Sequence, residues 1–200
     1  VFNFLQVHYK LKTYKHLIVS PRHTHNALVK MINKEVENHR AGLPSGIRLK
    51  LNAITNFSII EKLYEASNEG IQIQMIVRGI CCLIPGVKGM SENIEVLSIV
   101  DKFLEHPRVY QFTNGGSPIT YISSADFMTR NIENRVEVAA PIYDKELQRQ
   151  IKEVFDIIWN DNVKARRLNG PIQNAFVKNN SKPTRSQFEI YEYYKKEVGL

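Results

Sequence analysis

An arginine, a histidine and a hydroxyl-rich turn are the residues of this sequence best suited to bind an anion. Arg78 follows an apolar run of strand length, His106 precedes another, and Ser123, Ser124 and Asp126 end a third. Ligand-binding groups in α/β sheets gather at strand ends, where the backbone leaves the sheet. If the fold brings these segments to one crevice, they form an anion site.

The chemistry that these residue types favour is phosphate binding and phosphoryl transfer. An arginine side chain offers a planar fork of donors that stays charged, which suits Arg78 to clamp phosphate oxygens. A histidine accepts or donates a proton near neutral pH, and His106 could also hydrogen-bond a bridging oxygen.

Simpler roles are open for every one of these residues. Arg78 could pair with a surface carboxylate, and His106 could cap a short helix. Ser123 and Ser124 fit ordinary turn chemistry, and Asp126 fits a helix or loop cap.

Apolar periodicity predicts the elements that must position these groups. Strands are predicted at residues 15–20, 47–52, 71–77, 94–100, 109–112, 119–123 and 135–140. Helices are predicted at residues 26–37, 57–67, 145–159 and 185–196. Two successive β-α-β units imply a parallel sheet with helices packed over it.

Local details of this pattern are also predicted. Gly70 is expected to stop the second helix. Alternation in the strand at 135–140 is expected to expose Arg135 and Glu137, and Leu147 is expected on the apolar face of the helix at 145–159. Residues 169–183 are expected to be irregular.

Composition allows one sizeable core and favours an anionic partner. The chain has 200 residues, 43% of them apolar, and a formal charge of +7. Charge alone does not choose among a nucleotide, nucleic acid, polyphosphate and a membrane surface. With no apolar run near the roughly 18 residues of a membrane span and no secretory signal, a soluble intracellular protein is expected.

Other candidate sites carry less weight. Adjacent Cys81 and Cys82 are expected to be reduced thiols, because a bridge between neighbours strains disulfide geometry. His23 and His25 lack a third metal ligand nearby. The segment at 86–89 lacks the Gly-Lys-Ser/Thr ending of a phosphate loop. The basic residues beyond 160 fit a solvated or inter-domain surface that could also steer a polyanion.

At the central segments the sequence resembles the ATP-dependent polyphosphate kinases, specifically their C-terminal domain. The resemblance covers roughly residues 15–160. It rests on Val77-Arg78-Gly79-Ile80-Cys81-Cys82-Leu83, Ser98-Ile99-Val100, Phe103-Leu104-Glu105-His106, Asn114-Gly115-Gly116, Tyr121-Ile122-Ser123-Ser124-Ala125-Asp126, Met128, Arg130-Asn131 and Arg135-Val136-Glu137-Val138, with Leu17-Ile18-Val19 and Lys50-Leu51-Asn52.

The resemblance implies an α/β fold, a phospholipase-D-like mixed sheet flanked by helices. It implies reversible transfer of the terminal phosphate of ATP to polyphosphate through a phosphohistidine on a preceding domain. By motif, Arg78 binds ATP phosphates and His106 is the second active-site histidine. Magnesium is the implied cofactor, with its ligands on the missing domain and no metal ligand here.

The resemblance also bears on organisation and partners. The chain begins at Val1, so residues 1–14 are expected to be a linker from a missing domain, 15–160 the catalytic domain and 161–200 a basic tail with a terminal helix. The isolated chain is expected to be inactive. Expected partners are ATP or ADP, polyphosphate, the upstream domains and further copies, without nucleic acid; the expected location is cytoplasmic, with possible membrane association of the full-length protein.

Two departures and two other functions stay open. Asn56 stands where the family usually has aspartate, and residues 22–25 do not match the usual turn. His106-Pro107-Arg108 with Ser123, Ser124 and Asp126 also looks like a degenerate phospholipase D signature. The alternatives are a non-catalytic polyanion-binding module and a phosphodiesterase, although the latter needs a second His-x-Lys motif that the sequence lacks.

Overall fold

One mixed β-sheet organises the chain. The computed structural model describes residues 14–170 and 173–199, and within them nine strands pair in the order β1-β7-β6-β5-β2-β3-β4-β8-β9. Strands β2, β3 and β4 are parallel, and the other neighbours are antiparallel. The strands are β1 (Ile18–Val19), β2 (Ile47–Leu51), β3 (Ile73–Val77), β4 (Ile94–Ser98), β5 (Arg108–Phe112), β6 (Ile119–Ser123), β7 (Val138–Ile142), β8 (Arg166–Asn169) and β9 (Gln173–Phe176).

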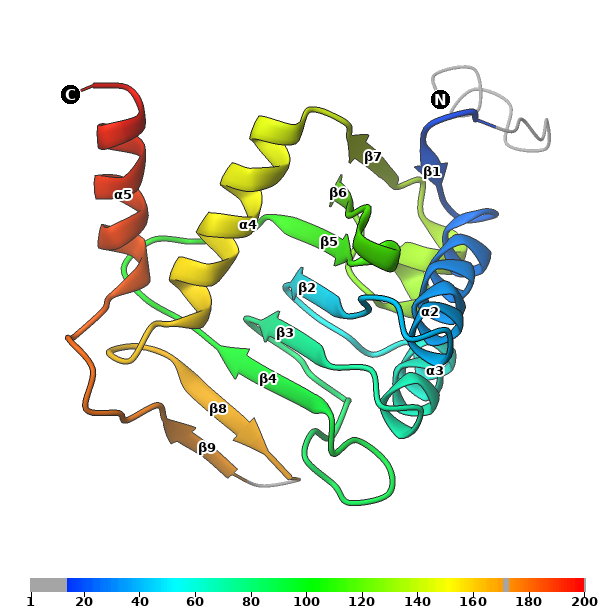
Figure 1. The fold of residues 1–200 in the computed structure, drawn as a ribbon, viewed down its shortest axis with the longest axis horizontal. Helices are drawn as coiled ribbons and strands as arrows, with labels where there is room; N and C mark the ends of the chain where they lie inside the picture. Colours follow the sequence, from blue (N-terminus) through cyan, green and yellow to red (C-terminus); the bar gives the residue numbers. More distant parts are fainter. Residues whose placement is uncertain (1–13, 171–172, 200) are drawn as a thin grey trace.

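Helices cover both faces of this sheet (Figure 1). Helices α2 (Thr24–Arg40) and α3 (Phe57–Asn68) pack on one face. Helix α4 (Lys145–Trp159) crosses the other, with α5 (Ser186–Glu197) beside it. A 3₁₀ turn (Asn114–Gly116) and a π-helical turn (Arg130–Asn134) complete the described elements.

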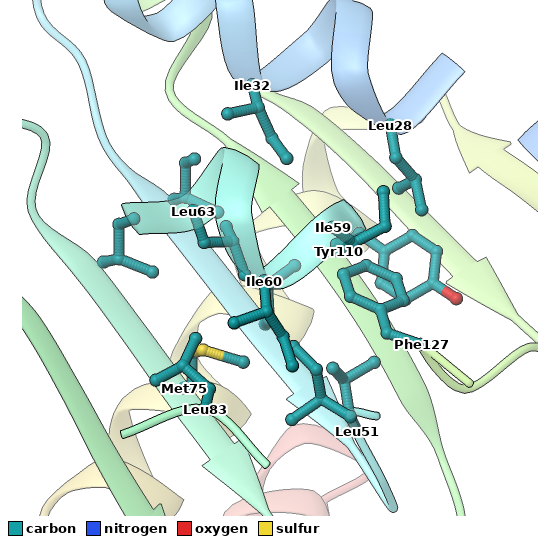
Figure 2. Packing of buried hydrophobic residues seen from close by; sticks show 14 of the residues in the cluster. Leu28, Ile32, Leu51, Ile59, Ile60, Leu63, Met75, Leu83, Tyr110 and Phe127 are labelled. Carbon is teal, nitrogen blue, oxygen red and sulfur yellow. The ribbon is translucent and has the colours of Figure 1, made fainter. Parts of the chain in front are cut away.

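The larger core lies between the sheet and α2 with α3, and Figure 2 shows side chains from both helices packed over the strands. In β3, Met75 and Val77 join this core, while Ile76 belongs to a second cluster with Phe155 and Ile158 of α4. Successive residues of a strand point to opposite faces, so four of the five residues of β3 are apolar because both of its faces are covered, and Gln74 is the exception.

Polar residues fix the helix ends. The side chain of Asn56 accepts a hydrogen bond from the Ile59 amide at 3.1 Å and caps α3. Asp144 caps α4 in the same way through the Leu147 amide at 2.9 Å. Gly70 follows α3 with a φ of 95°, a left-handed conformation that favours glycine, so its predicted role as a helix stop is confirmed.

Each predicted strand and helix has a counterpart in β1 to β7 and α2 to α5. The prediction of two successive parallel β-α-β units is half wrong. Strands β2 and β3 are parallel neighbours, but β1 pairs antiparallel with β7 at the edge of the sheet. Three strands, β7, β6 and β5, lie between β1 and β2. Apolar spacing identifies a strand without indicating which neighbour it joins.

Three local predictions are also wrong. Residues 169–183 are not irregular throughout, since β9 pairs with β8; both strands are short and polar, so backbone pairing and not apolar alternation identifies them. Glu137 is only 11% exposed because it accepts hydrogen bonds from Ser124 and Asn131, although Arg135 is exposed as predicted. Leu147 is exposed near the start of α4.

The predicted linker lies almost wholly outside the described residues, and the predicted domain limits stay predictions. Strands β8 and β9, which follow residue 160, extend the same sheet through pairing of β8 with β4. No helix in the described part of the chain is long and apolar enough to cross a membrane.

Leu63 of α3 provides a test of the larger core, because its side chain is completely buried. We expect Leu63→Ala to lower the free energy of unfolding by about 2–5 kcal/mol through lost burial and a residual cavity. Leu104→Ala, at a position 76% exposed, is the control and should change it by less than about 0.5 kcal/mol. Urea denaturation of both variants measures the difference; equal effects would contradict this account of the core.

Candidate functional site

Strand order brings the predicted site residues to one edge of the sheet. Arg78 follows β3, whose carboxyl end lies beside that of β2. Strand β5 is antiparallel to β2, so its amino end, which follows His106, lies at the same edge. Strand β6 in turn pairs its last residue with the first of β5, which places Asp126 there. Figure 1 shows the arrowheads of β2, β3 and β4 pointing toward this edge.

Arg78 and His106 are in contact. The Nη2 atom of Arg78 lies 3.3 Å from Nδ1 of His106. Because a guanidinium can only donate, the imidazole accepts at Nδ1 in this contact, which leaves the ring proton on Nε2. The two residues predicted to share one site therefore lie side by side, and their roles stay predictions.

Asn52, just beyond β2, orients Arg78. Its side-chain oxygen accepts a hydrogen bond from Nε of Arg78 at 3.1 Å. The adjacent backbones are close: the Gly79 amide donates to the Asn52 carbonyl at 2.8 Å, and a Cβ at Gly79 would lie 2.9 Å from that oxygen. A glycine is required here because any side chain would push the two strand ends apart.

The alternative that Arg78 pairs with a surface carboxylate is wrong for the part of the chain that the structure describes. Arg78 forms no ion pair there and contacts neutral partners, Asn52 and His106. His106 does not cap a helix, since it lies exposed in the irregular loop between β4 and β5. A half-buried guanidinium beside an exposed imidazole is an arrangement that an anion can reach.

Asp126 ties three strand ends together beneath this pair. Its Oδ1 accepts hydrogen bonds from the amides of Asn52 and Ala53 at 2.7 and 3.2 Å. Its Oδ2 accepts from Nη2 of Arg108 at 2.8 Å, and Arg108 also donates to the carbonyl of His106 at 3.0 Å. Asp126 is thus neither a helix cap nor a free carboxylate.

The charge state of Asp126 follows from these contacts. Burial disfavours the carboxylate, but the hydrogen bonds from Arg108 and from the two amides outweigh it and lower the pKa of Asp126 below its usual value. The Arg108–Asp126 pair is largely buried, with both side chains at most 12% exposed. It therefore fixes the start of β5, immediately after His106.

Helix α5 holds the loop that carries His106. The side-chain amide of Gln187 accepts from the Phe103 amide at 2.9 Å and donates to the Phe103 carbonyl at 2.8 Å and to Glu105 at 3.0 Å. Arg185 makes two hydrogen bonds to Asp101 at 2.6 and 2.8 Å. Sequence reasoning missed these contacts because more than 80 residues separate the partners and neither segment carries a motif for them.

The serines of the predicted turn have structural roles. Ser123 Oγ accepts from the Ala125 amide at 3.0 Å, and Ser124 Oγ contacts Glu137 and accepts from the Val138 amide. The turn-chemistry alternative is therefore confirmed for Ser123, while Ser124 instead joins the turn to β7 and the residue before it. Of the degenerate phospholipase D signature, His106, Arg108 and Asp126 lie at the shared edge.

Other candidates do not join the site. His23 and His25 lie at the start of α2, where His25 Nε2 is 2.8 Å from Ser58 Oγ. Among the described residues no group of three His, Cys, Asp or Glu side chains could hold a metal ion. Cys81 and Cys82 are free thiols as predicted, and burial raises the pKa of Cys81 to about 11. Asn56 caps α3 and also donates to Glu133 at 3.1 Å, which aspartate could not do.

The architecture is that of the phospholipase D fold. A phospholipase D family member, Nuc from Salmonella typhimurium, superimposes with a TM-score of 0.56 at 15% identity, covering 77% of this chain and 97% of that chain. NucT from Helicobacter pylori superimposes at 0.51 with 17% identity over 70% and 91% of the two chains. At these identities the likeness shows the fold alone.

The family follows from closer matches. Residues 17–187 match the model of the polyphosphate kinase C-terminal domain 2, and the chain belongs to that family. It is 44% identical over 98% of its length to polyphosphate kinase of Escherichia coli K12 and 45% identical to that of Vibrio parahaemolyticus. Polyphosphate kinase from Porphyromonas gingivalis has a TM-score of 0.93 at 39% identity over 98% of this chain and 30% of that one. The chain spans 28% of the length of the two curated relatives.

Removing the charge of Asp126 should expose its role in joining the strand ends. We expect Asp126→Asn to lower the free energy of unfolding at about pH 7 by roughly 3–5 kcal/mol, because Arg108 loses its buried partner. A lowered pKa in the folded state means that the wild-type carboxylate stabilises the fold above its unfolded pKa and stops doing so as pH falls through its folded pKa.

The difference between wild type and Asp126→Asn should therefore shrink as pH falls below 3.8, the usual pKa of aspartate. Chemical denaturation at neutral and acid pH measures this change. The control is Asp144→Asn, since asparagine caps a helix about as well as aspartate. A loss of stability that is independent of pH would show that charge at Asp126 is not what joins the strands.

Proposed function

We propose that this domain takes part in reversible transfer of the terminal phosphate of ATP to inorganic polyphosphate, as half of an active site completed by another part of a longer protein. The observation that carries the proposal is the Arg78–His106 contact at the strand-end edge of a polyphosphate kinase C-terminal domain. The names of the relatives support the substrate class.

The proposed reaction uses a histidine of a preceding domain as the nucleophile. The bond between the γ-phosphorus of ATP and its bridging oxygen breaks, ADP leaves with the electron pair, and the histidine nitrogen forms the new bond. The phosphoryl group then passes to a terminal oxygen of polyphosphate, which frees the histidine. The reverse sequence makes ATP from polyphosphate and ADP.

In this proposal Arg78 neutralises charge on the phosphate oxygens. Phosphoryl transfer depends mostly on positioning and on electrostatic stabilisation. Asn52 fixes the Nε end of the guanidinium, so its Nη atoms are turned toward His106 and the exposed edge. A fixed fork loses little freedom when it binds phosphate.

His106 would act on the bridging or terminal oxygen. Its Nδ1 accepts from Arg78, so its Nε2–H is the group that can donate to a phosphate oxygen. Donation to the bridging oxygen would stabilise ADP as it leaves, and the loop contacts from α5 would keep the ring in place.

No group of three His, Cys, Asp or Glu side chains that could hold a metal ion is present among the described residues. The proposal places the magnesium ligands and the phosphorylated histidine in the rest of the longer protein. ATP as a substrate favours a cytoplasmic location, and assembly into homo-oligomers stays a prediction. The alternative function is a polyanion-binding module, which the half-buried Arg78 would also support without any chemistry.

The role of His106 can be tested in the full-length protein. We expect His106→Ala to lower turnover by about 100-fold to 10,000-fold, the usual contribution of a positioned acid or base, with little change in melting temperature. His106→Gln separates two roles, because glutamine donates a hydrogen bond but cannot shuttle a proton. High activity in the Gln variant with little in the Ala variant indicates phosphate binding.

His25→Ala is the matched control, since His25 hydrogen-bonds Ser58 and contacts neither Arg78 nor His106. It should leave turnover unchanged. A His106→Ala enzyme that is destabilised yet fully active would contradict the proposed role.

The role of Arg78 can be tested by binding. We expect the 200-residue chain to bind polyphosphate weakly, with affinity that falls as salt rises through Debye screening. Arg78→Ala should weaken binding by about tenfold, in line with the loss of a charge-assisted hydrogen bond. Arg40→Ala removes the same charge from a surface pair with Glu69 and is the control. Equal affinity of wild type and Arg78→Ala would count against the phosphate clamp.

A further inference from the structure

A cavity begins at Arg78 and extends along the end of the sheet toward β8 and β9. Its volume is about 530 Å³. Its described lining residues are Arg78, Gly79, Ser98, Val100, Lys164, Arg166, Leu168, Asn174 and Phe176. The pairing of Ser98 with Arg166 explains this position, because it sets the start of β8 beside the carboxyl end of β4 (Figure 1).

The charges lining this cavity all have one sign. Arg78, Lys164 and Arg166 are half-buried, and no carboxylate is among the described lining residues. Within residues 14–170 and 173–199, none of the three cations forms an ion pair with a carboxylate. A cavity lined by cations that have no carboxylate partner favours an anion as its ligand.

The next residue along β8 shows that this arrangement is specific to one side of the strand. Arg167 points away from the cavity, is exposed and pairs with Glu95. Asp101 is already bound by Nε and Nη2 of Arg185, and these hydrogen bonds are the main cause that lowers its pKa, with a smaller contribution from Lys164. The nearby carboxylates are thus occupied by other cations.

The side chain of Arg166 and the backbone of Lys164 are held in place. The guanidinium of Arg166 lies 3.9 Å from the centre of the Phe176 ring and donates to the Asn174 carbonyl at 3.2 Å. Lys164 lies in a turn fixed by Asp161, whose Oδ1 accepts from the amides of Val163 and Lys164 at 2.9 and 2.6 Å. A positively charged groove built before the ligand arrives binds at a lower entropic cost.

We propose that this cavity is a subsite for a condensed phosphate chain, in which Lys164 and Arg166 hold phosphate units beyond the one bound by Arg78. The identity of the anion rests on the proposed function. A ligand with a charge on every unit matches a row of separate cations that starts at the reaction edge. Arg166 lies over one face of the Phe176 ring, which is 48% exposed, so the choice of polyphosphate over nucleic acid rests on the proposed function, and single-stranded RNA is included in the test.

The test compares binding of long-chain polyphosphate, tripolyphosphate, orthophosphate and ATP to the 200-residue chain at low salt. We expect the double variant Lys164→Gln with Arg166→Gln to lose about tenfold or more in affinity for long-chain polyphosphate, and much less for orthophosphate and ATP. The control is Arg167→Gln, which removes one charge from the same strand outside the cavity and should change affinity less than about threefold.

Lys164→Gln alone keeps the test valid if loss of Arg166 loosens β9, and it should weaken polyphosphate binding in the same direction. Lys164→Arg keeps the positive charge and should bind long-chain polyphosphate about as tightly as wild type.

Unchanged long-chain affinity in the Gln variants, together with weaker binding in Arg78→Ala, would overturn the subsite and leave the proposed function intact. Single-stranded RNA of matched length is the competing ligand. If it bound as tightly as polyphosphate, and if the same variants lost this binding, the assignment of the ligand would be overturned. Absence of any polyphosphate binding by wild type would instead contradict the proposed function itself.

Discussion

The carboxylate of Asp126 is the contact on which the geometry of the site edge depends. It belongs to the segment after β6, accepts hydrogen bonds from the backbone just beyond β2, and pairs with Arg108 at the start of β5. A buried carboxylate is stable only when its oxygens accept hydrogen bonds. Separating these strand ends would therefore leave a buried charge without a partner or expose it to water. Asn52 and His106, which both contact Arg78, leave the sheet from ends that this carboxylate joins.

A second layer of polar contacts comes from the end of the chain. Gln187 and Arg185 hydrogen-bond the loop between β4 and β5, at Phe103 and Asp101 respectively. The loop itself has little apolar anchorage, since Phe103 and Leu104 are exposed. Hydrogen bonds from α5 therefore hold the loop in place. His106 is positioned by Arg108, which donates to its carbonyl, and by Gln187 of α5, which contacts the preceding residue Glu105.

The phospholipase D fold explains why several strand ends meet at this edge. Parallel strands β2, β3 and β4 end together, and the antiparallel strands beyond β2 return their own ends to the same edge. Fixed donors can then be presented from several strands at once. Arg78 after β3 and Lys164 and Arg166 at the start of β8 form no ion pair among the described residues, and they give this part of the edge a positive charge.

The sequence by itself determined most of the helices and strands and the two candidate site residues. Apolar periodicity located β1 to β7 and α2 to α5, because it reflects which faces must be buried. Arg78 and His106 were selected by their residue types and motifs, and the structure places them in contact. The order of the sheet, the strands β8 and β9, the grip of Gln187 on the loop and the cavity around Lys164 and Arg166 were decided only by the tertiary structure. Each of these depends on hydrogen bonds or charges between residues far apart in the chain, and no local pattern of apolar and polar residues encodes such pairings.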